Sequence, residues 1–407
     1  MGFPTNIGKV FVKTQASGWG TEETSFAAAD LISAKTNLPK VVMEALKSES
    51  FRGGWHSFPI EPGSRQGATT TIEHIPQGPS LTTPAANPSD YPEAILLASL
   101  MGAQAAIGYT SGLLSASGQT TSAIKFTDTT LATTWAGMAM IATLVGGARE
   151  IVWGKTIDIA SSPDVFTPWF TMAAAVDPTG TPKTYGGRVC WDSLTQPTPF
   201  TVQTLLGQSD GAAAIRLRDA VCNSAKFTLE AGKQPQSSYG ILAGYWSPAG
   251  TWTVAPYTVQ YPELPALFGA NGARVKYAGA ATIFPKVEIE FTADMQAVSG
   301  LGQTDAFAKF ICVDRDCTIT ITELLTAYGT GQNLPGTEVA TGMQIDFCTI
   351  PGRAISMFFP TYQVLAVWED EDASGFAVRK TKYGTRPTAV ETAGANAANS
   401  CRRVALL

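Results

Sequence analysis

The clearest pattern in the chain is a regular alternation of apolar and polar residues. It is strongest in residues 223–246, where Ala225, Phe227 and Leu229 alternate with polar side chains. Successive side chains of a strand point to opposite faces, so this alternation predicts a strand with one buried and one exposed face. Turn-forming residues follow at 232–235 (Gly-Lys-Gln-Pro). A second strand ending near Trp246 should therefore complete a hairpin.

The same alternation recurs at residues 286–292 and 318–323, and a further strand pair is expected at 353–367 and 374–383. Residues 58–75 are also strand-like. The repetition predicts a mainly β chain, with strands that each bury one face.

One helix is expected over residues 91–102. Asp90 is a candidate N-cap, Pro92 suits the first turn, and Glu93 has the spacing of a capping box. Gly102 is expected to end the helix. A second helix is expected across residues 211–221.

Several segments lack a clear period. Residues 76–92 contain five prolines and predict a long extended loop. Residues 103–187 suggest an insertion or a duplicated half-domain, and their most apolar part, 131–148, is interpreted as a buried helix or strand pair because Thr and Gly dilute it. Residues 386–407 are interpreted as a C-terminal tail, disordered or ordered only by a partner.

Composition narrows the class of protein. The 407 residues allow one elaborated domain or two, and charged residues make up only 15%. A surface with so few charged residues suits extensive contact with other proteins. The alternative is a soluble enzyme whose surface carries few charges. The net charge is -5, and the sequence has no long run of basic residues. Both observations argue against tight binding of nucleic acid, which needs a basic surface. Without a secretory leader at the start of the sequence, synthesis in the cytoplasm is expected.

Three possible chemical motifs lack an essential part. Ser209 lies in a Gly-x-Ser-x-Gly pattern, but the only histidines, His56 and His74, precede it, whereas α/β-hydrolases need a later one. Residues 370–375 copy half of a calcium loop, but Thr381 stands where a bidentate Glu is needed. Residues 313–316 place two aspartates beside an arginine, which is more often an ion pair than a catalytic site.

The six scattered cysteines fit no zinc ribbon, so reduced thiols are expected. Cys401, near the end of the sequence, is the one candidate for a bond between chains. No cofactor and no metal are expected.

The order of the segments resembles a known family. Residues 217–235, the strand ending at 244–246, the strand at 286–292 and residues 314–323 resemble, in this order, the major tail tube proteins of long-tailed (siphovirus-like) bacteriophages. An opening arm at 1–20, with a Gly-Trp-Gly-Thr turn, and the proline loop entering a helix follow the usual layout of that family. The resemblance covers most of residues 1–385, which are expected to form the tube domain.

The resemblance implies a β-sandwich or half-barrel with a flanking α-helix. Subunits of that family form rings, hexameric or pseudo-hexameric, whose strands make a continuous β-barrel around a lumen. The stacked rings conduct genomic DNA into the host. Implied partners are other copies of the chain, the tape measure and terminator proteins and passing double-stranded DNA, with no membrane. The implied location is the tail of the virion, and no catalysis is implied.

Two features of the residues agree with that function. Long alternating strands with few blocking charges would aggregate as monomers but suit a polymer. An acidic or neutral lumen wall would let DNA slide through the tube, whereas a basic wall would bind the DNA phosphates.

Candidate lumen-facing residues occupy the polar faces of expected strands, although the same pattern fits an outward face; they are Glu230, Glu288, Glu290 and Asp346. Candidate ring-stacking segments are the arm at 2–13, the tail after Arg386 and the proline loop, with Pro76, Pro79, Pro84 and Pro88. Two alternative functions remain: a capsid or decoration protein of a virion, and a serine hydrolase using Ser209.

Deletion of residues 76–87 tests the stacking loop. We expect the shortened protein to fold but to form no tubes, because the contact between rings would be lost. Electron microscopy of the deletion variant beside the unaltered protein measures this, and tubes of normal length would refute the assignment.

Overall fold

The chain is mainly β, as its sequence predicts, with several antiparallel sheets and one half-barrel. The structure is a computed structural model. It describes residues 8–27, 30–32, 34–36, 40–47, 60–76, 91–106, 114–127, 135–179, 184–206, 213–249, 273–277, 280–282, 284–298, 309–324, 335–339, 341–371, 377–386 and 397–407. Within these ranges there is one α-helix, α1 (Pro92–Met101), and a short 3-10 helix, η3 (Ala397–Asn399).

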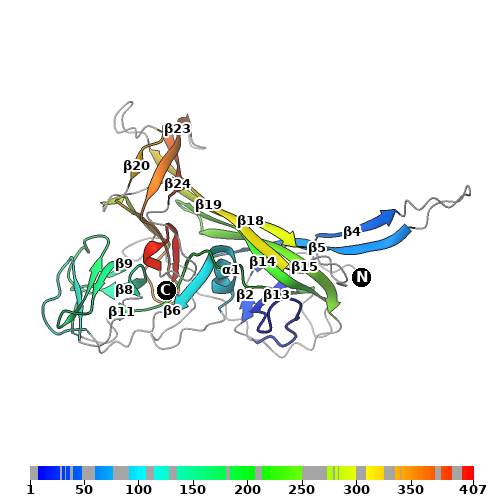
Figure 1. The fold of residues 1–407 in the computed structure, drawn as a ribbon. Helices are drawn as coiled ribbons and strands as arrows, with labels where there is room; N and C mark the ends of the chain where they lie inside the picture. Colours follow the sequence, from blue (N-terminus) through cyan, green and yellow to red (C-terminus); the bar gives the residue numbers. More distant parts are fainter. Residues whose placement is uncertain are drawn as a thin grey trace, which may run out of the picture.

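The largest sheet has thirteen strands and runs across the molecule, with one hairpin of it projecting at the right of Figure 1. Its main path is β2-β1-β13-β14-β18-β19-β24-β23-β20, and β15, β5, β3 and β4 branch from β14. We call it the long sheet. Its strands are β1 (Gly8–Thr14), β2 (Leu31–Ile32), β3 (Ala34–Thr36), β4 (Lys40–Lys47), β5 (Ile60–His74), β13 (Phe200–Leu206), β14 (Ala213–Glu230), β15 (Gln236–Ala249), β18 (Lys286–Val298), β19 (Lys309–Leu324), β20 (Glu338–Val339), β23 (Tyr362–Glu371) and β24 (Ala377–Thr385).

The predicted hairpins of this sheet are confirmed. Strands β14 and β15 pair from Ala214 to Thr228, and the turn between them contains Gly232 at φ 81°. The pair β23 and β24 is also present. The helix predicted at 211–221 is wrong, because residues 213–221 form the first half of β14. Pairing with β13 on one edge and β15 on the other overrides the local helical pattern.

A seven-stranded sheet forms the middle layer, in the order β17-β16-β21-β22-β25-β12-β6. Its strands are β6 (Gly102–Ala106), β12 (Arg188–Asp192), β16 (Arg274–Tyr277), β17 (Ala280–Thr282), β21 (Met343–Asp346), β22 (Ile355–Phe359) and β25 (Arg403–Leu406). Every residue of β12, β21, β22 and β25 is buried. This sheet is therefore covered on both faces.

The third sheet has five strands, in the order β11-β8-β9-β10-β7. It is drawn in teal at the left of Figure 1. Its strands are β7 (Ile124–Phe126), β8 (Ala139–Thr143), β9 (Arg149–Asp158), β10 (Asp164–Pro168) and β11 (Thr184–Tyr185). All of it comes from residues 103–187, whose origin as an insertion or duplicated half stays a prediction. Residues 131–148 were expected to form a buried helix or a strand pair; their described part contains one buried strand, β8, whose partner β9 begins just after this segment. No helix of the described chain is long and apolar enough to cross a membrane.

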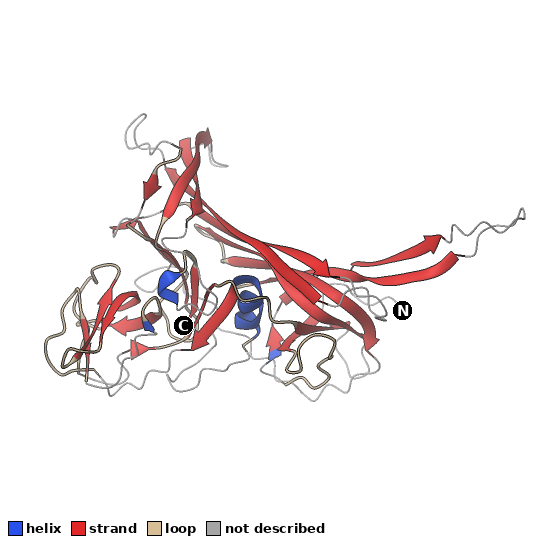
Figure 2. Cartoon of the chain, viewed as in Figure 1, coloured by secondary structure: helices blue, strands red, loops and turns tan. Residues whose placement is uncertain are grey.

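The helix has the predicted limits, but its surroundings differ from expectation. Gly102 ends it with φ 96°, as predicted, whereas its N-cap is Tyr91 and makes no side-chain capping bond. Nine of its ten residues are buried. It packs on β14 and β1 on one side and on β12 and β6 on the other, so it is enclosed between sheets rather than flanking them (Figure 2).

Two hydrophobic cores lie on opposite faces of the seven-stranded sheet. Alternate residues of β25 show the division, because Val404 and Leu406 join the core beneath the long sheet. Ala405, and Leu407 just beyond the strand, join the core beneath the five-stranded sheet. Alternation along β22 divides Ile355 and Phe358 in the same way. The protein is therefore a stack of three layers.

Both ends of the described chain are internal, which corrects two predictions. The predicted arm includes β1, which pairs along its whole length with β13 and has Val10, Phe11 and Val12 fully buried. The predicted C-terminal tail includes β25, which lies between β22 and β12. The β domain that was expected to end at residue 385 therefore includes residues 403–406. The Ala- and Asn-rich composition of residues 386–400 suggested a disordered tail. The apolar residues 404–407 instead hold this part of the chain in the middle sheet, because they are buried there.

Substitution of Leu406 by Ala tests the importance of β25. Leu406 is fully buried, so we expect a loss of about 2–5 kcal/mol in the free energy of unfolding. Leu324, which is 54% exposed, is the matched control, and Leu324→Ala should change stability by less than about 0.5 kcal/mol. Urea unfolding of the two variants measures the difference. Equal midpoints would contradict the central position of β25.

Candidate assembly surface

Where β14, β18 and β19 pair, the long sheet has one apolar and one polar face, whereas near β1 and β13 both faces carry buried apolar side chains. On β14, Ala225 and Phe227 are fully buried, whereas Lys226 is exposed. On β18, Ile289 is fully buried and its neighbour Glu290 is exposed. The apolar face covers the helix and the middle layer. The opposite face of these strands, here called the polar face, is exposed or half-buried at most positions.

Cross-strand pairing arranges the polar face into rows. The first row joins Glu230, Lys286, Thr322 and Lys380, the second Thr228, Glu288, Thr320 and Lys382, and the third Lys226, Glu290, Thr318 and Gly384. Three of the four predicted lumen-facing residues, Glu230, Glu288 and Glu290, thus lie side by side on this face. Whether this face lines a lumen is a question of assembly.

Lysine side chains form ion pairs with Glu230 and Glu288 on the polar face. Lys226 Nζ lies 3.3 Å and Lys286 Nζ 3.5 Å from Glu288 Oε1, and Lys233 Nζ lies 2.6 Å from Glu230 Oε1. Partial burial opposes ionisation of Glu288, but hydrogen bonds and charge from the two lysines outweigh it and lower its pKa. Exposed pairs of this kind contribute at most about 1 kcal/mol each. The polar face is therefore a mixed, hydrated surface.

The fourth predicted lumen residue, Asp346, is wrongly assigned. It is 1% exposed and lies between the middle layer and the five-stranded sheet. Gln344 Nε2 donates to Asp346 Oδ2 at 2.8 Å, and Ser356 Oγ donates to Asp346 Oδ1 at 2.6 Å. Burial raises the pKa of Asp346 to about 6, with Lys276 opposing the shift. Alternation identified the polar side of β21 correctly, but another sheet covers that side.

Polar contacts also join these two layers around Asp346. Trp153 Nε1 donates to Ser356 Oγ at 2.8 Å, and Gln344 Nε2 donates to the Ile151 carbonyl at 3.0 Å. Lys276 of β16 forms a buried ion pair with Glu150 of β9. The sequence showed no motif for this cluster, because its members come from distant strands.

The predicted stacking loop lies mostly outside the described residues. Of its prolines, Pro79, Pro84 and Pro88 fall there, and Pro76 is buried. The base of the loop is fixed by side chains from both ends. His74 Nε2 lies 3.4 Å from Glu93 Oε1, and Tyr239 OH donates to the same oxygen at 2.6 Å. Glu93 therefore interacts with His74 and Tyr239 in the core and does not form a capping box.

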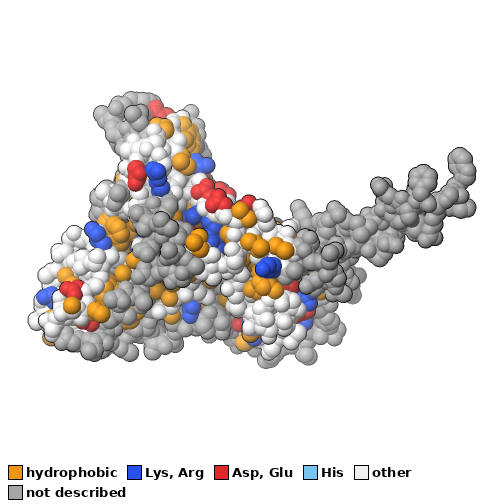
Figure 3. Space-filling model, viewed as in Figure 1, with side chains coloured by type: hydrophobic (Ala, Val, Ile, Leu, Met, Phe, Trp, Pro, Cys, Tyr) orange, Lys and Arg blue, Asp and Glu red, His pale blue; other side chains and the backbone are white. Residues whose placement is uncertain are grey.

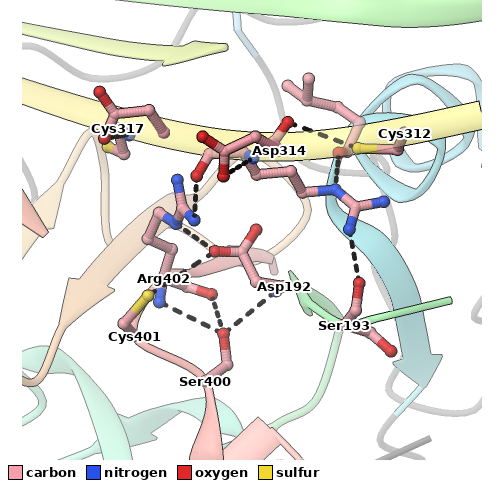
Figure 4. Close-up of polar contacts among 11 residues, drawn as sticks. Asp192, Ser193, Cys312, Asp314, Cys317, Ser400, Cys401 and Arg402 are labelled. Carbon is pink, nitrogen blue, oxygen red and sulfur yellow. Dashed lines mark hydrogen bonds and ion pairs between the residues drawn. The ribbon is translucent and has the colours of Figure 1, made fainter. Parts of the chain in front are cut away.

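Another buried polar cluster attaches the C-terminus to β19 (Figure 4). Arg402 forms a buried ion pair with Asp192, and its Nη2 donates to the Arg315 carbonyl at 2.9 Å. Arg315 Nε in turn donates to the Leu100 carbonyl at 2.7 Å, at the end of α1. The sequence suggested that Arg315 pairs with its neighbouring aspartates, but its guanidinium instead binds main-chain carbonyls.

Beyond its first residues, the outer edge of β23 is not paired with any strand that the structure describes. β20 pairs with Tyr362 and Gln363, and from Leu365 onward the described residues supply no strand on that side. Leu365 is 47% and Trp368 40% exposed. An open strand edge with exposed apolar side chains is a site for pairing with another chain.

The motifs of enzyme chemistry gain no support from the fold. Ser209 lies outside the described residues, and the flanking elements β13 and β14 are two paired strands, whereas a nucleophile elbow needs a strand followed by a helix. Among the described residues, no group of three or more His, Cys, Asp or Glu side chains is placed to hold a metal ion.

The cysteines are all free thiols, as expected, and Cys401 is 2% exposed. The prediction that Cys401 bonds between chains is therefore wrong for the folded subunit. Burial raises the pKa of Cys190 and Cys222 to about 12, which keeps these thiols protonated.

No protein-family model matches the chain, and no curated protein is significantly similar to it in sequence.

Substitution of Asp346 by Asn tests the buried cluster through pH. The pKa of Asp346 is raised from 3.8 to about 6, so its favourable contribution is complete below pH 4 and is lost as the pH rises through 6. The variant should lack this loss, which amounts to about 3 kcal/mol for a two-unit shift. Urea unfolding at pH 4 and pH 7 measures it. Glu288→Gln is the control, because the lowered pKa of Glu288 gives the opposite slope. Identical pH dependence of wild type and Asp346→Asn would contradict the assignment.

Proposed function

We propose that the chain is a structural subunit of a bacteriophage tail tube. It polymerises as stacked rings around a lumen that conducts genomic DNA, and it performs no catalysis. The observation that supports this best is the long sheet: the apolar side chains of β14, β18 and β19 are buried inside the subunit, while no described strand pairs with the outer edge of β23 from Leu365 onward.

The open edge supports self-assembly. A strand edge with free N–H and C=O groups pairs most readily with another strand, and in a ring each subunit can supply one. The described part of β23 places Leu365 and Trp368 beside this edge, where a neighbouring subunit would bury them. Head-to-tail contacts of this type close into rings when the rotation between subunits permits it.

The character of the polar face supports the conduction of DNA. Its first three rows hold threonines and glutamate–lysine pairs, and the lysines Lys226 and Lys286 are held by Glu288. Phosphate binding depends on cations that exchange their counterions with DNA. A wall of this composition would pass a duplex without gripping it.

This function places the protein in the virion tail after synthesis in the host cytoplasm. Its partners would be other copies of itself in a hexameric or pseudo-hexameric ring, a tape measure protein, a terminator protein and non-specifically bound DNA. The β-sandwich or half-barrel would become part of a continuous β-barrel in the ring. No membrane partner and no cofactor are proposed.

Negative-stain electron microscopy of the purified protein at increasing concentration tests the proposal. We expect stacked rings or hollow tubes, because the open edges should pair as the concentration rises. Closed shells or particles that bind only to preformed capsids would favour a capsid or decoration protein. Monomers at all concentrations, and after addition of tail initiator proteins, would refute the proposed function.

A gold label determines which face lines the lumen. In a Cys312→Ser background, Glu290→Cys carries an exposed thiol on the polar face, and Lys155→Cys on β9 is the matched control on the five-stranded sheet. We expect maleimide-gold on residue 290 to appear on the tube axis and gold on residue 155 to appear outside. Label from residue 290 on the outer wall would refute the lumen assignment.

A further inference from the structure

The buried cluster between the middle layer and the five-stranded sheet groups one lysine with two carboxyl groups. The chain has few charges, and the face shown in Figure 3 carries only scattered acidic and basic side chains. Lys276, Glu150 and Asp346 are nevertheless buried, at 7%, 4% and 1% exposure. Burial of a charge is costly even when the charge is paired. Three ionisable side chains that meet in the interior are therefore a candidate for chemistry.

The strand register and one contact between layers bring the three side chains together. β16 and β21 pair Lys276 with Gln344, so Asp346, two residues further along β21, is a diagonal neighbour of Lys276 on the same face. Lys276 Nζ contacts Glu150 Oε1 of β9, in the other layer. The Ala173 N–H donates to the second oxygen, Glu150 Oε2, at 3.0 Å. The amine thus lies against one carboxyl group, with another beside it.

Apolar side chains border this cluster. Trp153 lies three residues beyond Glu150 on β9, and its ring stacks on Phe358 with 5.5 Å between the centroids. Both rings belong to the core beneath the five-stranded sheet. An apolar environment disfavours charged groups, so it favours transfer of the proton from the Lys276 ammonium to the Glu150 carboxylate. This transfer gives a neutral amine, which is a nucleophile, beside a neutral carboxylic acid.

We propose that Lys276 and Glu150 condense to form an isopeptide bond. The Lys276 nitrogen attacks Glu150 Cδ, a C–N bond forms, and the C–O bond to Oε1 breaks. Asp346 accepts a proton from the attacking nitrogen and returns it to the departing hydroxyl group, which leaves as water. The products are one amide and one water, so the reaction needs no oxidant or other reactant.

The surroundings suit each of these steps. The two reacting groups are held in contact by the fold, which gives them an effective concentration far above any in solution. The Ala173 N–H stabilises the negative charge that develops on Glu150 Oε2 during the attack. Burial raises the pKa of Asp346 to about 6, close to the range in which a carboxyl group exchanges protons efficiently at neutral pH. The amide product is neutral and replaces a buried ion pair.

The bond would join two layers of the molecule. β16 belongs to the middle sheet and β9 to the five-stranded sheet, and the chain between the two bonded residues would become a closed loop. Such a link restricts the unfolded chain, as a disulfide does, but it is not broken by reducing agents. This inference concerns the single subunit and does not depend on the proposed function.

Mass spectrometry of the denatured wild-type protein tests the bond. We expect an intact mass lower than that of the sequence by one water. Trypsin cannot cleave after a bonded lysine, so residues 150–155 should be recovered joined to residues 275–286. The full mass of the sequence would overturn the proposal. A link from 275–286 to residues 316–353, which contain Asp346, would overturn Glu150 as the bonded residue.

A double variant removes both reacting groups together. Lys276→Met with Glu150→Gln leaves no unpaired charge from this pair in the interior, and we expect it to fold and to have its full mass. The matched control is Lys155→Met, at an exposed lysine of β9, which should lose water as the wild type does. Circular dichroism compares the folding of the two variants. Loss of water from the double variant would overturn the bond.

Substitution of Asp346 by Asn tests its part in the reaction. The variant keeps both reacting groups but lacks the proton acceptor, which should slow the condensation by about a hundredfold or more. Most of the purified variant should therefore have its full mass and should lose water only on long incubation. Complete linkage immediately after purification would overturn the role of Asp346.

Discussion

The central constraint of this structure is that the middle sheet is completed by the last strand of the chain. β25 lies between β22 and β12 and supplies apolar side chains to both cores. A strand buried on two faces must be apolar on both, which explains why residues 404–407 are Val-Ala-Leu-Leu. The long sheet and the five-stranded sheet contact opposite faces of this layer. Their positions relative to each other therefore depend on β25, which is far in the sequence from most of the strands that it joins.

Buried polar contacts define how the layers are aligned. Arg402 with Asp192 joins the C-terminus to β12, and Lys276 with Glu150 joins the middle layer to the five-stranded sheet. Apolar layers can slide with little change in buried area, whereas a buried charge must meet its partner at one position. Loss of one partner leaves an uncompensated buried charge, which destabilises a protein by several kcal/mol. These pairs thus select one arrangement of the layers.

The same layering leaves the polar face of β14, β18 and β19 without a covering sheet among the described residues. The apolar side chains of β14, β18 and β19 are buried against α1 and the middle layer. In the proposed assembly, association would use strand edges and the exposed side chains of β23. Contacts of this kind are directional. They suit a regular polymer better than an amorphous aggregate.

The sequence by itself determined the strands and the faces of the long sheet. Alternation predicted β14, β15, β18, β19 and the β23–β24 pair, and Gly102 correctly marked the end of the helix, because these signals are local. It placed Glu230, Glu288 and Glu290 on a polar face for the same reason. Only the tertiary structure decided what covers each face. Asp346 has the same alternation as the glutamates but lies under a second sheet, residues 213–221 became a strand because neighbours pair with both edges, and the C-terminal residues became a central strand. A local pattern records which side of a strand is polar, whereas burial depends on residues far away in the chain, and no spacing along the sequence records that contact.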